Sequence, residues 1–289
     1  MNMQVIPENK ILGAKVVGAD LSQPIKQEHR DEIIQWLGDY GVLAFTKQEL
    51  NPKQVRDFSA NFGDLEINVA KIAQDPDLPE VMTLSNMVED GKPLGLSDAG
   101  QDWHTDMSYS KMIAFANILY GIKIPYRNGK SLGNTEFSNM QAAYEGLPKD
   151  IQKLLENKTI THDFNKFWEK MRQEKGSSRP PLTPEQLRAK PPVTHPAILI
   201  HPISKKKVLY ANPGYSIRIN ELPEDESILL LDLLFEHQLQ EKYRYAFEWE
   251  EKTVLMWDNM GTIHNAVADY LPHEHRYIKR CQVAANLFF

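Results

Sequence analysis

Short strand-like segments follow one another along the chain, separated by glycine and proline and interrupted by only a few helices. This alternation is typical of a β-barrel or a β-sandwich that carries helical insertions. We therefore predict a mainly β fold with helical insertions. We expect a strand or a hairpin over residues 11–21, and strands over residues 42–45, 113–124, 197–201, 207–210, 243–249, 253–257 and 276–284.

Hydrophobic residues at helical spacing predict four helical regions. The first covers residues 28–39 and ends before Gly41, and the second begins after Asn51, a residue type that caps helices well. Residues 141–158 are expected to form two helices with a break at Pro148. The most regular pattern covers 223–240.

Two segments lack a regular pattern. Residues 85–102 are polar and glycine-rich, and we expect a long loop that leads into His104. Residues 172–192 are polar and proline-rich, but strand-like sequence resumes directly after them. We interpret the stretch from about 146 to 192 as an excursion inserted into a single domain that spans residues 1–289.

Composition excludes several classes of protein. The formal net charge of −6 argues against nucleic acid as the main partner, because phosphate binding needs a basic surface. The single cysteine, Cys281, excludes an intrachain disulfide and fits a reducing compartment. No segment resembles a signal peptide or approaches the roughly 18 apolar residues of a membrane span. We expect a cytoplasmic protein without a membrane or nucleic-acid partner.

Three side chains form a candidate metal-binding set. His104 and Asp106 lie two positions apart within Trp103-His-Thr-Asp106, so both can face one side of a strand or bind one ion at its end. His264 follows Trp257-Asp-Asn259 and a glycine turn. Two imidazoles and one carboxylate hold one face of a non-haem iron(II) ion and leave positions open for oxygen chemistry.

Two arginines follow the second histidine. Arg276 and Arg280 lie four positions apart and share one face of an expected strand, while Lys279 lies on the other face. Guanidinium groups form paired hydrogen bonds with carboxylates and similar anions. Arg276 can therefore anchor a ligand whose other end binds the metal.

The chain resembles the taurine dioxygenase and 2,4-dichlorophenoxyacetate dioxygenase family of iron(II)/2-oxoglutarate oxygenases. The resemblance covers nearly the whole chain, and the combination of motifs is highly specific. These motifs are Gly13-Ala14, Gly18-Ala-Asp-Leu21, Gly41-Val-Leu43, Phe62-Gly63, Trp103-His-Thr-Asp106, Gly133-Asn-Thr-Glu-Phe137, His195-Pro196, Leu209-Tyr-Ala-Asn212, Trp257-Asp-Asn259, His264 and Arg276-x-x-x-Arg280.

The resemblance implies a double-stranded β-helix, or jelly roll, that uses Fe(II), 2-oxoglutarate and O2. It implies that His104, Asp106 and His264 bind the iron. Thr135 and Arg276 are implied to hold the distal carboxylate of 2-oxoglutarate, and Arg280 to bind the acidic group of the primary substrate. Trp257 is implied to lie near the metal, although its pattern also fits a core residue.

The chain also departs from the taurine-type pattern. Gly100 stands four residues before the first histidine, where those enzymes carry an asparagine, and residues 68–72 replace a loop that contains His and Tyr. These differences argue against taurine itself, while other sulfonates remain compatible. Lys71 in that early loop could reach an anionic substrate or lie in solvent.

We therefore expect a dioxygenase that hydroxylates a small carboxylate or sulfonate and releases succinate and carbon dioxide. One alternative is hydroxylation or desaturation in a natural-product pathway. Another is a metal-binding jelly roll without oxygenase activity, or a zinc hydrolase that uses the same ligands. A homodimer or homotetramer is compatible with the family, and the Phe288-Phe289 end could contribute to an interface or to the core.

Overall fold

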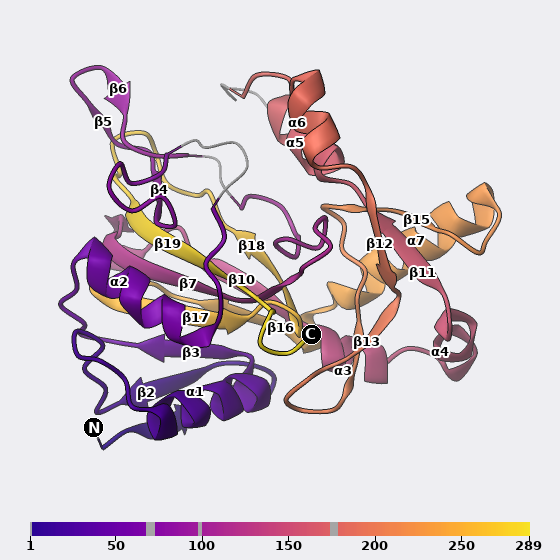
Figure 1. Ribbon diagram of the computed structural model, residues 1–289, viewed down its shortest axis with the longest axis horizontal. Coiled ribbons are helices and arrows are strands. Elements are labelled where there is room, and N and C mark those ends of the chain that lie inside the picture. The colour runs from indigo at the N-terminus through magenta and orange to yellow at the C-terminus, as the bar shows by residue number, and fades with distance from the viewer. Residues whose placement is uncertain (1, 68–72, 98–99, 174–178) are drawn as a thin grey trace.

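A seven-stranded sheet forms the centre of the computed structural model, which describes residues 2–67, 73–97, 100–173 and 179–289 (Figure 1). Neighbouring strands are antiparallel except β2 and β3, which are parallel. Across the sheet the strands are β1 (Gln4–Pro7), β2 (Ala14–Val17), β3 (Val42–Phe45), β17 (Thr253–Asp258), β7 (Ala114–Lys123), β19 (Tyr277–Ala284) and β4 (Met82–Ser85).

Helices cover one face of this sheet. Successive side chains of a strand point to opposite faces, so Val254 and Met256 of β17 pack in the same core as the helices, whereas Leu255 and Trp257 point away from it. The helices are α1 (Gln27–Tyr40) and α2 (Pro52–Ser59). Each fully buried aliphatic side chain at this layer stabilises the fold by about 1.5–3 kcal/mol.

The ends of these helices follow the sequence prediction. The Asn51 side chain accepts a hydrogen bond from the Gln54 N–H, and the Gln54 side chain accepts one from the Asn51 N–H, which together form a capping box. α1 ends at Gly41, whose φ of 69° favours glycine. The predicted helix over 28–39 and the helix start at Asn51 are confirmed.

A smaller sheet packs against the other face. Its order is β16 (Arg244–Phe247), β10 (Thr135–Asn139) and β18 (Thr262–Ala266). Phe137 from β10 packs with Leu255, Trp257 and Ile278 from the large sheet. The protein is therefore mainly β with helices, as predicted. The candidate active site lies in the space between the two sheets.

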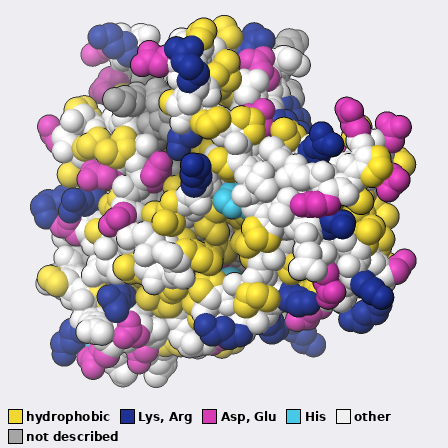
Figure 2. All heavy atoms as spheres, turned by 45° about the vertical axis from the view of Figure 1, so that its right-hand side comes forward, with side chains coloured by type: hydrophobic (Ala, Val, Ile, Leu, Met, Phe, Trp, Pro, Cys, Tyr) yellow, Lys and Arg dark blue, Asp and Glu magenta, His cyan; other side chains and the backbone are white. Residues whose placement is uncertain are grey.

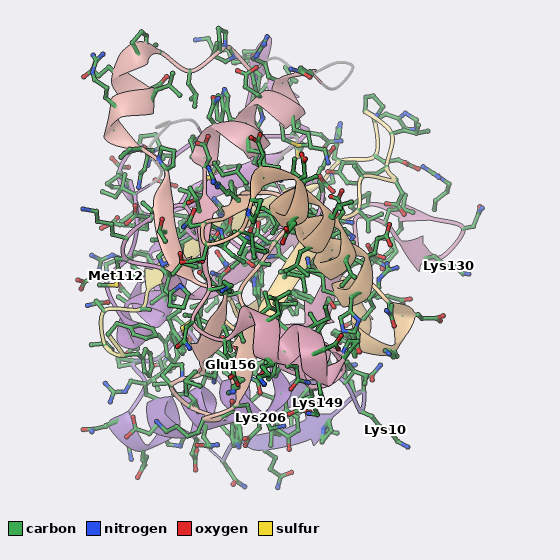
Figure 3. The ribbon with its side chains drawn as sticks, turned by 90° about the vertical axis from the view of Figure 1, so that its right-hand side faces the viewer. Lys10, Met112, Lys130, Lys149, Glu156 and Lys206 are labelled. Atoms are coloured by element: carbon green, nitrogen blue, oxygen red, sulfur yellow. The ribbon has the colours of Figure 1, made fainter. Side chains whose placement is uncertain are left out.

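A second body extends from one end of the smaller sheet and lies on the right in Figure 1. Figure 3 shows its charged residues Lys149, Glu156 and Lys206 on the outer side, where all three are exposed. The body has its own apolar core. Its elements are α3 (Met140–Glu145), α4 (Lys149–Leu155), β11 (Thr159–His162), β12 (Val193–Pro196), β13 (Ile198–Ile200), β14 (Lys207–Leu209), β15 (Ser216–Ile219) and α7 (Glu224–Gln238).

Two helices follow β11 above this body: α5 (Phe164–Gln173) and α6 (Pro184–Ala189). In Figure 2, a histidine side chain is visible near the middle of the face, with hydrophobic side chains below it and a Lys or Arg side chain directly above it. None of the helices in the described parts of the chain combines the length and apolarity that crossing a membrane requires.

Three local predictions need correction. The expected loop over 85–102 contains a hairpin of β5 (Val88–Glu89) and β6 (Lys92–Pro93). The polar segment 172–192 contains α6, because Thr183 and Gln186 form a capping box at its start. Within 11–21 only β2 is extended, and its hairpin partner is the preceding β1. A further hairpin joins β8 (Tyr126–Arg127) to β9 (Lys130–Ser131).

Candidate active site

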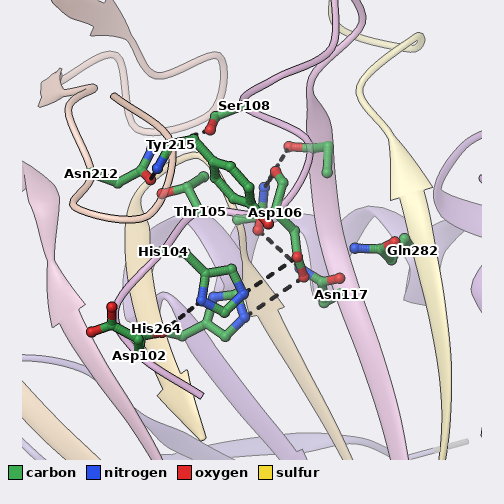
Figure 4. A network of polar contacts seen from close by, with 12 residues as sticks. Asp102, His104, Thr105, Asp106, Ser108, Asn117, Asn212, Tyr215, His264 and Gln282 are labelled. Carbon is green, nitrogen blue, oxygen red and sulfur yellow. Dashed lines mark hydrogen bonds and ion pairs between the residues drawn. The ribbon is translucent and has the colours of Figure 1, made fainter. Parts of the chain in front are cut away.

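His104, Asp106 and His264 lie together between the two sheets, although almost 160 residues separate the two histidines (Figure 4). His104 Nε2 is 3.4 Å from Asp106 Oδ1, and His264 Nε2 is 3.6 Å from Asp106 Oδ2. All three side chains are buried, and their candidate donor atoms lie within 4.8 Å of one another. Among the described residues this is the group of acidic, histidine and cysteine side chains able to hold a metal ion.

Backbone pairing brings the two histidines together. The His104 N–H donates to the His264 carbonyl over 3.0 Å, and the His264 N–H donates to the His104 carbonyl over 2.9 Å. β18 carries His264 and pairs with β10, where Phe137 is its register partner. Asp106 follows in a turn, and the positive φ of 58° at Met107 directs the chain away after it.

The His104 ring has a defined orientation and tautomer. Its Nδ1–H donates to the Asp102 carbonyl over 2.8 Å, which leaves the Nε2 lone pair towards Asp106. The backbone of Gly214 packs directly against this residue, since a Cβ there would lie 2.7 Å from the His104 Cβ. A larger residue at position 214 would therefore displace His104.

The electrostatics match a metal-binding set. Burial alone would raise the pKa of Asp106, but Arg280 and the two imidazoles outweigh it and hold that pKa well below its usual range. Burial lowers the pKa of His264 well below its usual value. The site thus combines a carboxylate with a neutral imidazole at His264, and metal ions require ligands in these deprotonated forms.

The residues present fit a divalent metal. Asp106 Oδ2 is buried and has no hydrogen-bond partner in the described parts of the chain. A buried carboxylate oxygen without such a partner, facing two imidazole nitrogens, is the arrangement a metal ion would satisfy. Two imidazoles and one carboxylate match the ligand type of non-haem iron(II) oxygenases, which keep open positions on the metal.

Arg276 directly precedes β19 of the large sheet, Thr135 begins β10 of the smaller sheet, and both are buried. Thr135 Oγ1 accepts a hydrogen bond of 3.0 Å from the Trp249 Nε1–H. Burial lowers the pKa of the Arg276 guanidinium, an effect that neighbouring Tyr270 partly offsets. Its Nε lacks a partner among the described residues, its Nη2 makes a long contact of 3.5 Å with the Gly133 carbonyl, and the Tyr270 side chain hydrogen-bonds to the guanidinium. A buried cation with unused donors is suited to bind an anion.

Gly133 makes room for this guanidinium. A Cβ at position 133 would lie 2.9 Å from Arg276 Nε, and the φ of +74° also favours glycine. The Gly133 N–H donates to Asp269 Oδ1 over 2.7 Å, which holds the turn in place. The glycine therefore shapes the space in which Arg276 lies.

Arg280 lies on the side of β19 that faces the His-Asp-His group. Its Nη1 is 3.6 Å from Asp106 Oδ2, and its Nη2 donates to Met82 Sδ over 3.2 Å. Lys279 contacts Asp75 at 3.1 Å and Thr83 at 3.0 Å instead. Arg280 and Lys279 therefore lie on opposite faces of β19, as the alternation of side chains along a strand predicts.

An aromatic wall lies beside His104. The Phe167 ring centroid is 4.9 Å from that of His104, and the Tyr215 centroid is 6.0 Å from it. The sequence reasoning did not identify these residues, although the spacing of Phe164, Phe167 and Met171 on α5 is helical and could have signalled a buried face. We define the aromatic wall as Tyr109, Phe164, Phe167, Met171 and Tyr215.

Trp257 is both a core residue and a neighbour of the site. It is buried, and its ring centroid lies 4.8 Å from that of His264. Other histidines form separate contacts: His195 Nε2–H donates to the Ser110 carbonyl over 2.9 Å, and His201 Nε2 lies 3.0 Å from Asp258 Oδ2. Lys71 lies outside the described residues.

The fold and the buried His-Asp-His group define a mainly β protein with a candidate metal site. A family model described as "Taurine catabolism dioxygenase TauD, TfdA family" matches residues 5–282. The chain belongs to this family and is a 2-oxoglutarate-dependent dioxygenase. This membership sets aside the zinc hydrolase and the non-catalytic metal protein.

Known proteins of several activities resemble the chain. Pentalenolactone F synthase of Streptomyces avermitilis is 30% identical, over 97% of this chain and 93% of its own. The alpha-ketoglutarate-dependent 2,4-dichlorophenoxyacetate dioxygenase of Cupriavidus pinatubonensis is 30% identical, over 91% and 92%. A taurine dioxygenase structure from Burkholderia xenovorans is 26% identical with a TM-score of 0.79, over 98% and 90%.

Proposed function

We propose that the chain hydroxylates a small acidic organic substrate with iron(II), 2-oxoglutarate and O2, giving succinate and carbon dioxide. The observation that carries this proposal is the buried group of His104, Asp106 and His264, together with the buried guanidinium of Arg276, whose Nε has no hydrogen-bond partner in the described parts of the chain. Iron(II) bound there would supply the activation of O2 that couples decarboxylation of 2-oxoglutarate to C–H hydroxylation. On this proposal the two sheets form a jelly roll within one domain, with the excursion at about 146–192.

The chain's own residues would position the two organic molecules. Arg276 and Thr135 would bind the distal carboxylate of 2-oxoglutarate, because the guanidinium has unused donors and the hydroxyl lies on the facing sheet. Arg280 would bind the acidic group of the substrate. It now lies next to Asp106, so a substrate anion would share its donors with that carboxylate.

The aromatic wall would hold the remaining body of the substrate and exclude water from the metal. Phe167 and Tyr215 contact each other and both approach His104. Such rings favour an apolar or aromatic substrate body over a fully polar one. Aryloxy acids and sulfonates with an apolar part are therefore the first substrates to screen.

A second candidate function is the oxidation of a natural-product intermediate, including desaturation. It is favoured by the 30% identity to pentalenolactone F synthase, the same identity as to the 2,4-dichlorophenoxyacetate dioxygenase. The same centre would serve both reactions, because they differ in the substrate and not in the metal ligands. Product analysis by mass spectrometry separates a gain of oxygen from a loss of two hydrogens.

Anaerobic titration with iron(II) and 2-oxoglutarate tests the centre directly. We expect a weak visible charge-transfer band that is lost in His104→Ala and Arg276→Ala. Succinate release with aryloxy acids and sulfonates then ranks substrates. Folded protein that binds iron but shows no band would refute the assignment of 2-oxoglutarate to this site.

A further inference from the structure

Two buried asparagines lie directly behind the carboxylate ligand. Asn117 lies in the middle of the apolar strand β7 and Asn259 follows β17, and both are fully buried. A primary amide in an apolar strand is unfavourable unless hydrogen bonds satisfy it. Asn117 is hydrogen-bonded to Asn259, and Asn259 is hydrogen-bonded to Asp106. Figure 4 shows Asn117 beside Asp106.

The hydrogen bonds have one consistent direction. Asn117 Nδ2 donates to Asn259 Oδ1 over 2.9 Å, and Asn259 Nδ2 donates to the Asp106 carbonyl over 2.8 Å. Asn259 Nδ2 also has a longer contact of 3.4 Å with the Ala114 carbonyl. Both partners of this nitrogen are carbonyls that can only accept, so the orientation of the amide follows from the network.

The pair is not an ordinary satisfied core contact. Asn117 Oδ1 is buried without a partner in the described part of the chain, so the arrangement retains an unpaired acceptor that is destabilising. The backbone of Asn259 is separately fixed, because its N–H donates to the Phe115 carbonyl over 2.9 Å. The side chain is therefore not required to hold the end of β17, and its contact with the Asp106 peptide needs another explanation.

We propose that Asn259, oriented by Asn117, is a positioning residue that fixes the Asp106 peptide and so presents the carboxylate to the metal. Asp106 lies in a turn, outside the described strands, and Met107 next to it has a positive φ. Without the Asn259 contact, this peptide loses its side-chain hydrogen bond to the large sheet. The inference rests on the proposed metal centre, which it extends to residues that do not touch the metal.

Cobalt(II) binding tests the inference without relying on turnover. In Asn259→Ala we expect the dissociation constant for Co(II) to rise about 10- to 100-fold, as is usual for partners of metal ligands. The visible d–d absorption should also change, because the carboxylate is less well oriented. Asn117→Leu keeps the branched shape and the number of heavy atoms of the side chain but removes its hydrogen bonds, and it should shift both readouts in the same direction by less. The double variant should bind no more weakly than Asn259→Ala, since the two residues act in series.

Ile118→Ala is the matched control. Ile118 is the neighbour of Asn117 on β7, is fully buried and faces the helices, so its truncation destabilises the same strand without touching Asp106. Its Co(II) affinity and spectrum should equal those of the wild type. The inference is overturned if Asn259→Ala and Asn117→Leu also match the wild type; if Asn259→Ala does not fold, Asn117→Leu alone decides. Absence of Co(II) binding in the wild type, with His104→Ala as reference, would instead overturn the proposed metal centre and this inference with it.

Discussion

The two sides of the candidate site differ in the groups that they offer. The large sheet contributes Asn117, Arg276 and Arg280, buried polar residues on β7 or at β19. The aromatic wall contributes rings and a thioether in van der Waals contact. Hydrogen bonds have strict geometry, whereas apolar packing tolerates substitutions of similar volume. The polar residues of the sheet side are therefore suited to a reaction step that does not vary. The aromatic wall can change by substitution and so accommodate different substrates.

The largest effect is expected on the ligand set itself. Asp106→Ala should weaken Co(II) binding by more than about 100-fold, beyond the range for residues that only support ligands. It also leaves Arg280 without its neighbouring carboxylate. Isothermal titration with Co(II) measures the loss, and Glu136→Gln, a carboxylate paired with Arg244 on the adjoining sheet, is the control. Comparable binding in both variants would show that Asp106 is no ligand.

Arg276→Met should raise the KM for 2-oxoglutarate by about 100-fold. Removing one partner of a buried charge pair costs about 3 kcal/mol, and each 1.4 kcal/mol corresponds to tenfold. Succinate formation against 2-oxoglutarate concentration gives the value. Lys279→Met removes a buried cation from the other face of the same strand and should leave that KM unchanged. An equal rise in both variants would point to general damage to β19.

The second body should be the acid-sensitive region. Burial lowers the pKa of His162 in β11 to about 3, from an ordinary 6.5. Between these values the unfolded chain binds the extra proton, so stability falls as pH drops below 6.5 and the loss is complete near 3. At about 1.4 kcal/mol per unit, this is about 2 kcal/mol by pH 5. Urea unfolding of His162→Phe should show a flatter acid dependence, while exposed His273→Gln should follow the wild type.

The smallest effect is expected on the aromatic wall. Phe167→Leu removes a ring that contacts His104 and Tyr215, worth about 0.5–1.5 kcal/mol for such pairs. The KM for the primary substrate should rise about 3- to 10-fold, while the KM for 2-oxoglutarate stays constant. Phe58→Leu, on the buried face of α2, is the control for lost stability. Equal changes in the two KM values would contradict the separation of the two sides.

Sequence reasoning succeeded where one signal dominates. β3, β7 and β17 are mostly apolar and mostly buried on both faces, and the helix starting at Asn51 has a complete capping box. β10 and β18 have few apolar residues, so nothing in their composition marks them as paired strands. That pairing places Thr135 beside Ala266 and Phe137 beside His264, and it depends on contacts between distant residues.

The same limit applies to the site. The spacing of His104 and Asp106 and the face expected to be shared by Arg276 and Arg280 are local patterns. The structure brings His104, Asp106 and His264 together and places Arg280 next to Asp106. The aromatic wall comes from three separate segments, so no local pattern contains it. Asn117 is readable as an amide in an apolar run, but its partner Asn259 is revealed only by the fold.

The register between β10 and β18 also fixes the distance between Thr135 and His264 along the sheet. Thr135 pairs with Ala266, two positions along from the pair of Phe137 and the metal-ligand candidate His264. Two residues of an antiparallel strand span about 7 Å, and this rise cannot be changed without slipping the whole pairing. If Thr135 and the metal hold the two ends of the cosubstrate, the sheet acts as a ruler for diacids. A homologue of 2-oxoglutarate with one methylene more or fewer would then not match the distance between Thr135 and the metal, and side-chain movement alone cannot change that distance.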